Sequence, residues 1–119
     1  MTGRVQDDLP RVRLDLHGFN GSVTVEFVID TGFDGELALP ASLLVRINSA
    51  FIGERYVYMA DMSLRLVKHY RAMLDWQDEE RVVEIMELDG RPLVGTLFLR
   101  GNLIQIEMED GGEVLIEPL

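Results

Sequence analysis

The chain has 119 residues, a formal net charge of −10, 47% apolar residues and no cysteine. This length fits one domain, so we assign residues 1–119 to a single domain and expect residues 1–8 to be a flexible N-terminus. The negative charge repels phosphate backbones and argues against nucleic-acid binding. Without cysteine there is no disulfide framework or thiolate zinc site. We expect no signal peptide, no membrane span and a cytoplasmic location.

The first predicted element is a β-hairpin. Residues 9–16 alternate between apolar and charged side chains, residues 23–29 again place apolar side chains on one face, and a glycine-containing turn separates them at 17–22. Alternation with a period of two is typical of half-buried strands, and two such strands around a short turn pair with each other.

The middle of the chain is predicted to hold a short helix and three strands. Residues 37–40 lead into a helix over 41–47, because Pro40 suits the first turn of a helix. Strands are expected over 53–60 and 63–76, with a turn at Asp61 and Met62. A polar turn at 77–80 leads into a strand over 81–88, and a turn at 89–92 follows.

The last predicted elements are a second short helix and a closing hairpin. Thr96 is expected to cap a helix over 97–100 that ends at Gly101. The hairpin joins strands over 103–108 and 114–117 through a turn at 110–112. Frequent turns and only two brief helical stretches predict an all-β fold, a closed or folded-over barrel.

The most informative segment is the apolar strand that runs into Asp30, Thr31 and Gly32. A carboxylate at the end of a buried strand is costly unless it is hydrogen-bonded or shares a proton. Thr31 offers a hydroxyl to backbone across an interface, and Gly32 allows its own amide to approach the carboxylate. The alternative interpretation is an ordinary turn capped by Asp30, because these three residue types are all common at turns.

Two motifs carry a resemblance to a known family. The segment from Val28 to Gly35 resembles the active-site signature of retropepsin-like aspartic proteases, and residues 36–40 resemble a small bacterial branch of that clan. Residues 92–95 resemble the paired hydrophobic residues and glycine that form the loop behind the family's active site. The resemblance covers residues 9–119 and implies a retropepsin-like closed β-barrel with one or two short helices.

The resemblance also implies an activity and a partner. The family cleaves peptide bonds with two carboxylates that share one proton, without a cofactor or a metal. This chain has one such motif, so the resemblance implies a homodimer in which Asp30 of each chain supplies one catalytic carboxylate and a peptide or protein is the substrate. Thr31, Gly32, Val94 and Gly95 then support the active site, with Thr31 reaching the partner's backbone.

Substrate-binding residues are expected in two places. One is the segment after Gly32, and the other is the tip of the hairpin that resembles the family's flap; together they comprise Phe33, Asp34, Gly35, Ala60, Asp61 and Met62.

Two positions depart from the family pattern. Thr96 stands where the viral enzymes have an arginine that holds the residue matching Asp34, so Asp34 is either held by another arginine or is a solvated turn residue. Close relatives tend to have glycine where Met62 stands. Because methionine resists positive φ, we expect another type of turn there.

Other functions stay open at this stage. A catalytically silent dimer of the same fold would bind a peptide in its cleft, although a binding module has no chemical need for the intact triplet at 30–32. Only two histidines are present, His17 and His69, and neither has a second ligand at metal spacing in the sequence. We therefore expect no metal site. Trp76 is expected in the core, and the acidic turn at 78–80 is expected to be solvated.

Overall fold

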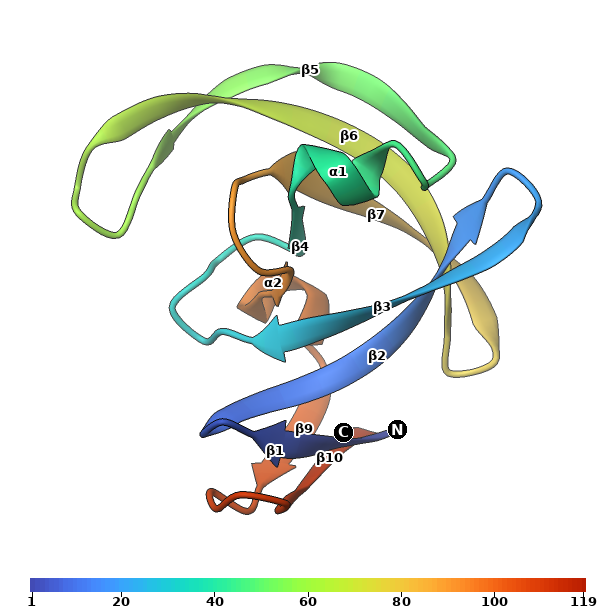
Figure 1. Cartoon of the computed structure of the whole chain (residues 1–119), viewed down its shortest axis with the longest axis vertical. Helices are drawn as coiled ribbons and strands as arrows, with labels where there is room; N and C mark the ends of the chain where they lie inside the picture. Colours follow the sequence, from blue (N-terminus) through green and yellow to red (C-terminus); the bar gives the residue numbers. More distant parts are fainter.

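The computed structural model describes all residues, Met1–Leu119, and strands dominate it (Figure 1). One ten-stranded sheet has the order β5-β6-β7-β4-β8-β3-β2-β1-β10-β9. The strands are β1 (Thr2–Gln6), β2 (Leu9–Gly18), β3 (Gly21–Ile29), β4 (Leu37–Leu39), β5 (Ser49–Tyr58), β6 (Leu64–Trp76), β7 (Glu79–Glu87), β8 (Leu93–Val94), β9 (Asn102–Ile106) and β10 (Glu113–Pro118). The predicted all-β class is confirmed.

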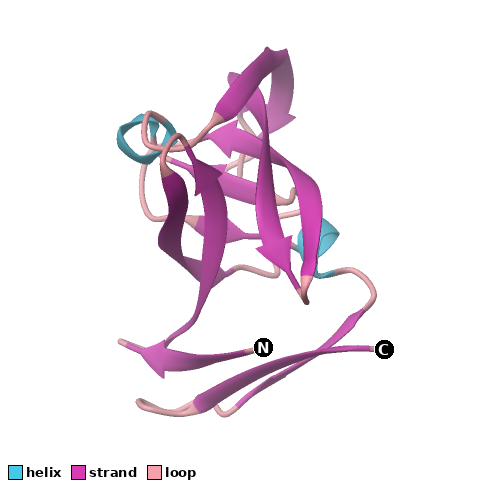
Figure 2. Cartoon of the chain, turned by 90° about the vertical axis from the view of Figure 1, so that its right-hand side faces the viewer, coloured by secondary structure: helices cyan, strands magenta, loops and turns pink.

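Two four-residue helices, α1 (Ala41–Leu44) and α2 (Thr96–Leu99), lie on separate parts of the sheet (Figure 2). Neither is long and apolar enough to cross a bilayer. The predicted hairpin of β2 and β3 forms with Val12 opposite Phe27. β2 also pairs with β6, with Leu16 opposite Leu74, so the sheet folds back on itself and encloses the core.

The core is one cluster of 21 buried apolar residues. Its largest fully buried side chains are Phe27 and Phe98. Trp76 packs edge-on against Phe98 with 4.8 Å between ring centroids, as its predicted core position requires. The Arg81 guanidinium lies 4.1 Å above the same phenyl ring, where the face of the ring attracts a cation. The core therefore extends to Arg81, a charged residue that also pairs with Glu36.

Element boundaries differ from the predicted ones where tertiary contacts intervene. The helix predicted over 41–47 ends at Leu44, because the Asn48 amide donates to the His17 carbonyl at 3.0 Å and draws the chain toward β2. β5 begins soon afterwards at Ser49. β7 begins at Glu79, after a two-residue turn at 77–78 in which both residues have positive φ.

The second helix begins one residue earlier than predicted, and Thr96 does not cap it. Gly95 is the N-cap, and no side chain caps this helix. The Thr96 amide donates instead to the Phe33 carbonyl at 2.9 Å, and its hydroxyl lies 3.4 Å from the same oxygen. Thr96 therefore ties the start of α2 to the loop after β3.

The N-terminal segment forms a strand, where a flexible terminus was expected. β1 pairs with β10 and with β2, and the Met1 amino group donates to the Ile116 carbonyl at 3.0 Å. Val5, the only apolar residue of the strand, is fully buried. The sequence pattern misses β1 because a single apolar residue among polar neighbours gives no alternation. Backbone hydrogen bonds to β2 and β10 hold the strand in place, and these do not depend on the side-chain pattern.

The burial of Val5 predicts a cost for shortening it. Val5→Ala should lower the free energy of unfolding by about 1–3 kcal/mol, because it removes two buried methyl groups and leaves a cavity. Gln6→Ala, on an exposed side chain of the same strand, is the matched control and should change it by less than about 0.5 kcal/mol. Urea denaturation followed by circular dichroism measures both, and equal stabilities would show that β1 does not contribute to the core.

Candidate active site

Asp30 follows directly after the buried end of β3. Val28 and Ile29 are buried, and the Asp30 amide donates to the Val94 carbonyl at 3.0 Å. The Gly32 amide donates to Asp30 Oδ1 at 2.9 Å, so a backbone N–H fixes one carboxylate oxygen. The Asp30 side chain is half-buried, and its second oxygen makes no hydrogen bond within the chain. The strand end thus presents an oriented carboxylate with one free oxygen.

β8 holds this strand end from behind. It lies between β3, with which it pairs in parallel at Ile29 and Val94, and β4, with which it pairs antiparallel. Gly95 follows, and its amide donates to the Glu36 carbonyl at 2.9 Å. A Cβ on Gly95 would lie 2.3 Å from the Gly35 carbonyl oxygen and 2.5 Å from that of Phe33. Only glycine allows the two loops to approach so closely.

The structure brings together the five residues assigned from sequence to the catalytic position and its support: Asp30, Thr31, Gly32, Val94 and Gly95. Thr31 is exposed, and its hydroxyl makes no hydrogen bond within the chain. Asp34, in the same loop, is exposed and forms no ion pair, so no arginine of its own chain holds it. Phe33 and Gly35 contribute backbone to the contact with Gly95.

A charged contact beside this loop was not found from the sequence. Arg81 Nη2 lies 2.9 Å from Glu36 Oε2, and its Nη1 donates to the Phe98 carbonyl at 3.2 Å. The other oxygen of Glu36 accepts the Glu84 amide at 3.0 Å. Such a half-buried ion pair withstands desolvation only with hydrogen bonds on both partners, as here. Glu36 stands alone among apolar residues, but nothing in the sequence names a partner 45 residues away.

The tip of the hairpin formed by β5 and β6 corrects the expectation for Met62. The Met62 amide donates to the Met59 carbonyl at 2.9 Å, the Met59 amide donates to the Ser63 carbonyl at 2.8 Å, and Met62 has a φ of +69°. This is a type I turn followed by a left-handed residue, a common hairpin connection in which glycine is usual. Asp61 Oδ1 accepts the Ser63 amide at 2.9 Å and also the Ser63 hydroxyl, which holds the tip in shape.

The tip and the base of this hairpin relate differently to the Asp30 loop. Ala60, Asp61 and Met62 are exposed and share no hydrogen bond with that loop, although Figure 1 shows the hairpin tip and the loop projecting toward the same side. The base does meet the loop, at a pocket of about 220 Å³. Its lining includes the expected Asp34 and Gly35, and also Glu36, Arg55, His69, Glu84, Met86 and Leu97. Those six were not recognised, because they are scattered over four elements and the intervening loop.

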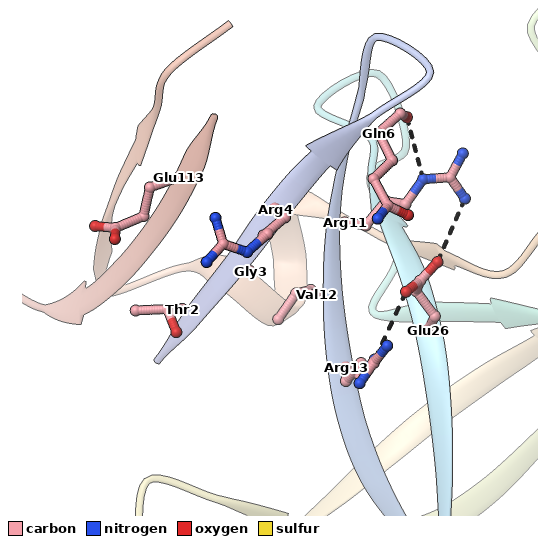
Figure 3. Close-up of a pocket in the computed structure, with 9 residues that line it drawn as sticks. All are labelled: Thr2, Gly3, Arg4, Gln6, Arg11, Val12, Arg13, Glu26 and Glu113. Carbon is pink, nitrogen blue, oxygen red and sulfur yellow. Dashed lines mark hydrogen bonds and ion pairs between the residues drawn. The ribbon is translucent and has the colours of Figure 1, made fainter. Parts of the chain in front are cut away.

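A larger hollow of about 290 Å³ lies elsewhere, on β1 to β3 and β10 (Figure 3). Arg11 and Arg13 both contact the Glu26 carboxylate there, at 3.5 and 3.6 Å. No residue of the Asp30 loop lines it, and only one of its nine lining residues is hydrophobic. Arg11 and Arg13 thus pair with Glu26, and Arg4 donates to the Gly111 carbonyl at 3.4 Å.

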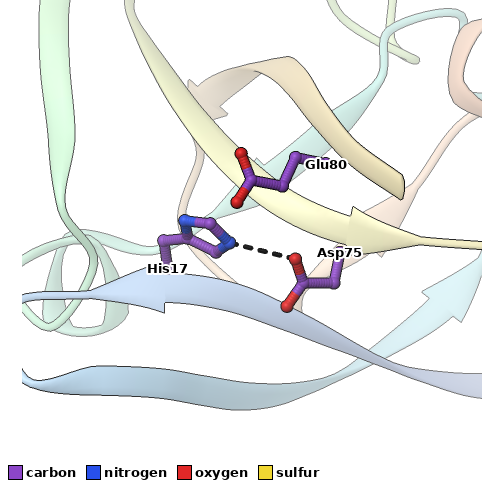
Figure 4. Close-up of side chains that lie close together, drawn as sticks. All are labelled: His17, Asp75 and Glu80. Atoms are coloured by element: carbon purple, nitrogen blue, oxygen red, sulfur yellow. Dashed lines mark hydrogen bonds and ion pairs between the residues drawn. The ribbon is translucent and has the colours of Figure 1, made fainter. Parts of the chain in front are cut away.

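One group of possible metal ligands lies apart from Asp30, where β2 pairs with β6 (Figure 4). His17 Nε2 is 3.1 Å from Asp75 Oδ1, and a carboxylate oxygen of Glu80 lies within 4.8 Å of both. Strand pairing brings these residues together, so the sequence expectation that His17 has no second ligand nearby missed them. His17 and Asp75 already bond to each other at the surface, and this cross-strand contact accounts for the group.

The arrangement at Asp30 has a definite chemical capacity. A carboxylate with one oxygen fixed and the other free accepts a proton from a bound water or hydroxyl, which is the act of a general base. The loop of one chain supplies one such carboxylate. Comparison with protein-family models, with curated proteins and with solved structures finds no match for this chain.

The turn at the hairpin tip gives a prediction for pH. The hydrogen bonds from the Ser63 hydroxyl and then the Ser63 amide lower the pKa of Asp61 below its ordinary 3.8. Because the folded pKa is depressed, the turn is stabilised above pH 3.8 and loses that stabilisation as pH falls through the lower folded value. NMR titration of the Asp61 carboxyl carbon should show a midpoint below 3.8, and Ser63→Ala should move it upward. A midpoint unaffected by Ser63→Ala would contradict the assigned cause.

Proposed function

We propose that this chain is one subunit of a homodimeric aspartic endopeptidase in which Asp30 of each subunit forms the catalytic pair. The observation that carries the proposal is the fixed Asp30 carboxylate, with Oδ1 held by the Gly32 amide at 2.9 Å and the second oxygen free within the chain. Support for its rigidity comes from the Val94 carbonyl and from the close contact at Gly95. The motif resemblance at 28–35 and 92–95 adds independent support.

The proposed reaction follows from two carboxylates that share one proton. The ionised carboxylate takes a proton from a water molecule, whose oxygen attacks the carbonyl carbon of the scissile peptide bond. The protonated carboxylate donates to the carbonyl oxygen as negative charge develops there. The carbon–nitrogen bond then breaks, the nitrogen leaves with a proton, and the products are a carboxylic acid and an amine.

Two further observations support the fold and the pairing that the reaction needs. The strand pairings run in a cycle through β2, β3, β8, β4, β7 and β6 and back to β2, which supports a closed, retropepsin-like barrel. The free, exposed Thr31 hydroxyl supports a second chain as its acceptor, and a two-fold axis is the commonest way for like chains to pair. The absence of cysteine fits a reducing, cytoplasmic setting.

A second candidate is a dimer of this fold that binds peptides without cleaving them. Tyr56 lies opposite Leu66, and Tyr58 lies opposite Leu64, so the four side chains share one face of the hairpin. Each of these side chains is more than half exposed. Contiguous exposed apolar groups of this kind are typical of binding surfaces. They serve a peptide ligand whether or not the carboxylate pair is active.

Replacing Asp30 separates the two candidates. Asp30→Asn keeps the size and the Gly32 contact but removes the base, so cleavage of a denatured protein substrate should fall at least about a hundredfold. Circular dichroism should be unchanged. Asp110→Asn, in the exposed β9–β10 turn, is the matched control and should retain full activity. Cleavage that persists in the Asp30 variant, or a wild type that binds peptides without cleaving them, would contradict the protease proposal.

The pairing of two chains predicts that activity depends on concentration. Dilution below the dimer dissociation constant removes the catalytic pair by mass action, so specific activity should fall in parallel with the dimer fraction. Sedimentation velocity across the same dilution series measures that fraction. A monomer with full specific activity would rule out a catalytic pair shared between subunits.

A further inference from the structure

The pocket between the Asp30 loop and the base of the hairpin is built for a single side chain. Its volume of about 220 Å³ is below the roughly 300–1,000 Å³ typical of a site for a whole small molecule. It is walled by Met86 from β7 and Leu97 from α2, and Asp34 lies at its rim on the catalytic loop. A peptide lying across Asp30 would therefore bring a neighbouring residue to this opening.

A buried histidine is among the residues that line this pocket. His69 is 2% exposed, and its Nδ1 lies 3.0 Å from the Val67 carbonyl. Because a carbonyl oxygen only accepts, Nδ1 carries the proton, and Nε2 of the neutral ring is left with its lone pair. No hydrogen bond reaches Nε2, yet no buried side-chain nitrogen lacks a partner, so Nε2 must reach the accessible surface. His69 lines this pocket, and we take the accessible Nε2 as the atom that it offers there.

The charges around the pocket determine what it accepts. Arg55 contacts both carboxylate oxygens of Glu84, at 3.3 and 3.4 Å, so these two charges are mutually neutralised. Glu36 is likewise paired with Arg81 at 2.9 Å. Asp34 has no ion pair and keeps an uncompensated negative charge. What remains is one free carboxylate, one free imidazole acceptor and two apolar walls, which match an apolar stem with a cationic, hydrogen-donating head.

We propose that this pocket selects an arginine or lysine side chain of the bound peptide, with Asp34 compensating the charge and His69 Nε2 accepting an N–H. The proposal rests on the proposed function, in that a peptide must lie across Asp30. It makes Asp34 and His69 determinants of specificity that act on substrate binding. Asp30 supplies the chemistry and is not part of this pocket.

Binding can be tested without catalysis in the Asp30→Asn protein. The probe is Nα-acetyl-arginine methylamide, compared with the citrulline analogue, which keeps the shape but lacks the charge, and with the glutamate analogue. Titrations are followed by amide chemical shifts and by the ¹⁵N shifts of the His69 ring. The arginine probe should shift His69 Nε2 and the amides of 34–36 and 84–86, and should bind at least about tenfold more tightly than the citrulline analogue.

Variants assign the effect to the named side chains. Asp34→Asn should weaken the arginine probe at least about tenfold, and His69→Phe about fivefold, while His69→Gln, which keeps an acceptor, should lose less. Asp110→Asn is the distant carboxylate control and should bind as the parent does. Equal affinity for the arginine and citrulline probes, shifts confined to other surfaces, or full affinity in Asp34→Asn would overturn the proposal.

The two proposals fail in distinguishable ways. If the wild type cleaves nothing but the arginine probe binds as described, the pocket stands and the protease function falls. If the wild type cleaves peptides without preference for arginine or lysine, and Asp34→Asn does not alter the products, the pocket assignment falls alone. Asp34 is exposed, so its variant tests the proposal even where a change at buried His69 impairs folding.

Discussion

The close contact between Gly95 and the backbone of residues 33–35 is the constraint on which the candidate site depends. It allows β8 to lie between β3 and β4, and this position places the Val94 carbonyl within 3.0 Å of the Asp30 amide. A Cβ at Gly95 would have to displace two backbone carbonyls, which cannot rotate away as a flexible side chain can. The orientation of the carboxylate is therefore set by backbone packing behind it.

The Glu36–Arg81 pair connects this contact to the core. Glu36 receives the Gly95 amide on its backbone carbonyl and the Arg81 guanidinium on its side chain. Arg81 lies in turn over the Phe98 ring, which packs against Trp76. The attraction between the two charges adds little net stability in this half-buried position, because both groups lose water when they are buried. Its main effect is to fix the positions of the loop, β7 and α2 relative to one another, because Arg81 on β7 contacts both Glu36 and the Phe98 carbonyl.

Local sequence patterns predicted the structure correctly where an element packs against the element next to it in the chain. The β2–β3 hairpin follows from alternation, whereas the placement of Val94 and Gly95 behind Asp30 was implied by the family resemblance of two short motifs. β1 was missed because a single apolar residue, Val5, gives no period. Arg55 on β5 and His69 on β6 were missed because they reach the pocket through the pairing of β6 with β5 and β7, which no local pattern encodes.

At the hairpin tip, the rule that methionine avoids positive φ did not predict the observed turn. Methionine resists positive φ by roughly 1–2 kcal/mol, yet Met62 adopts +69° in a turn that the Asp61 contacts with Ser63 stabilise. The side chain recovers none of this cost by packing, since it is 78% exposed. Burial of the Met62 side chain would offset part of this backbone cost. Under the proposed function, a bound peptide or a second subunit would supply such burial.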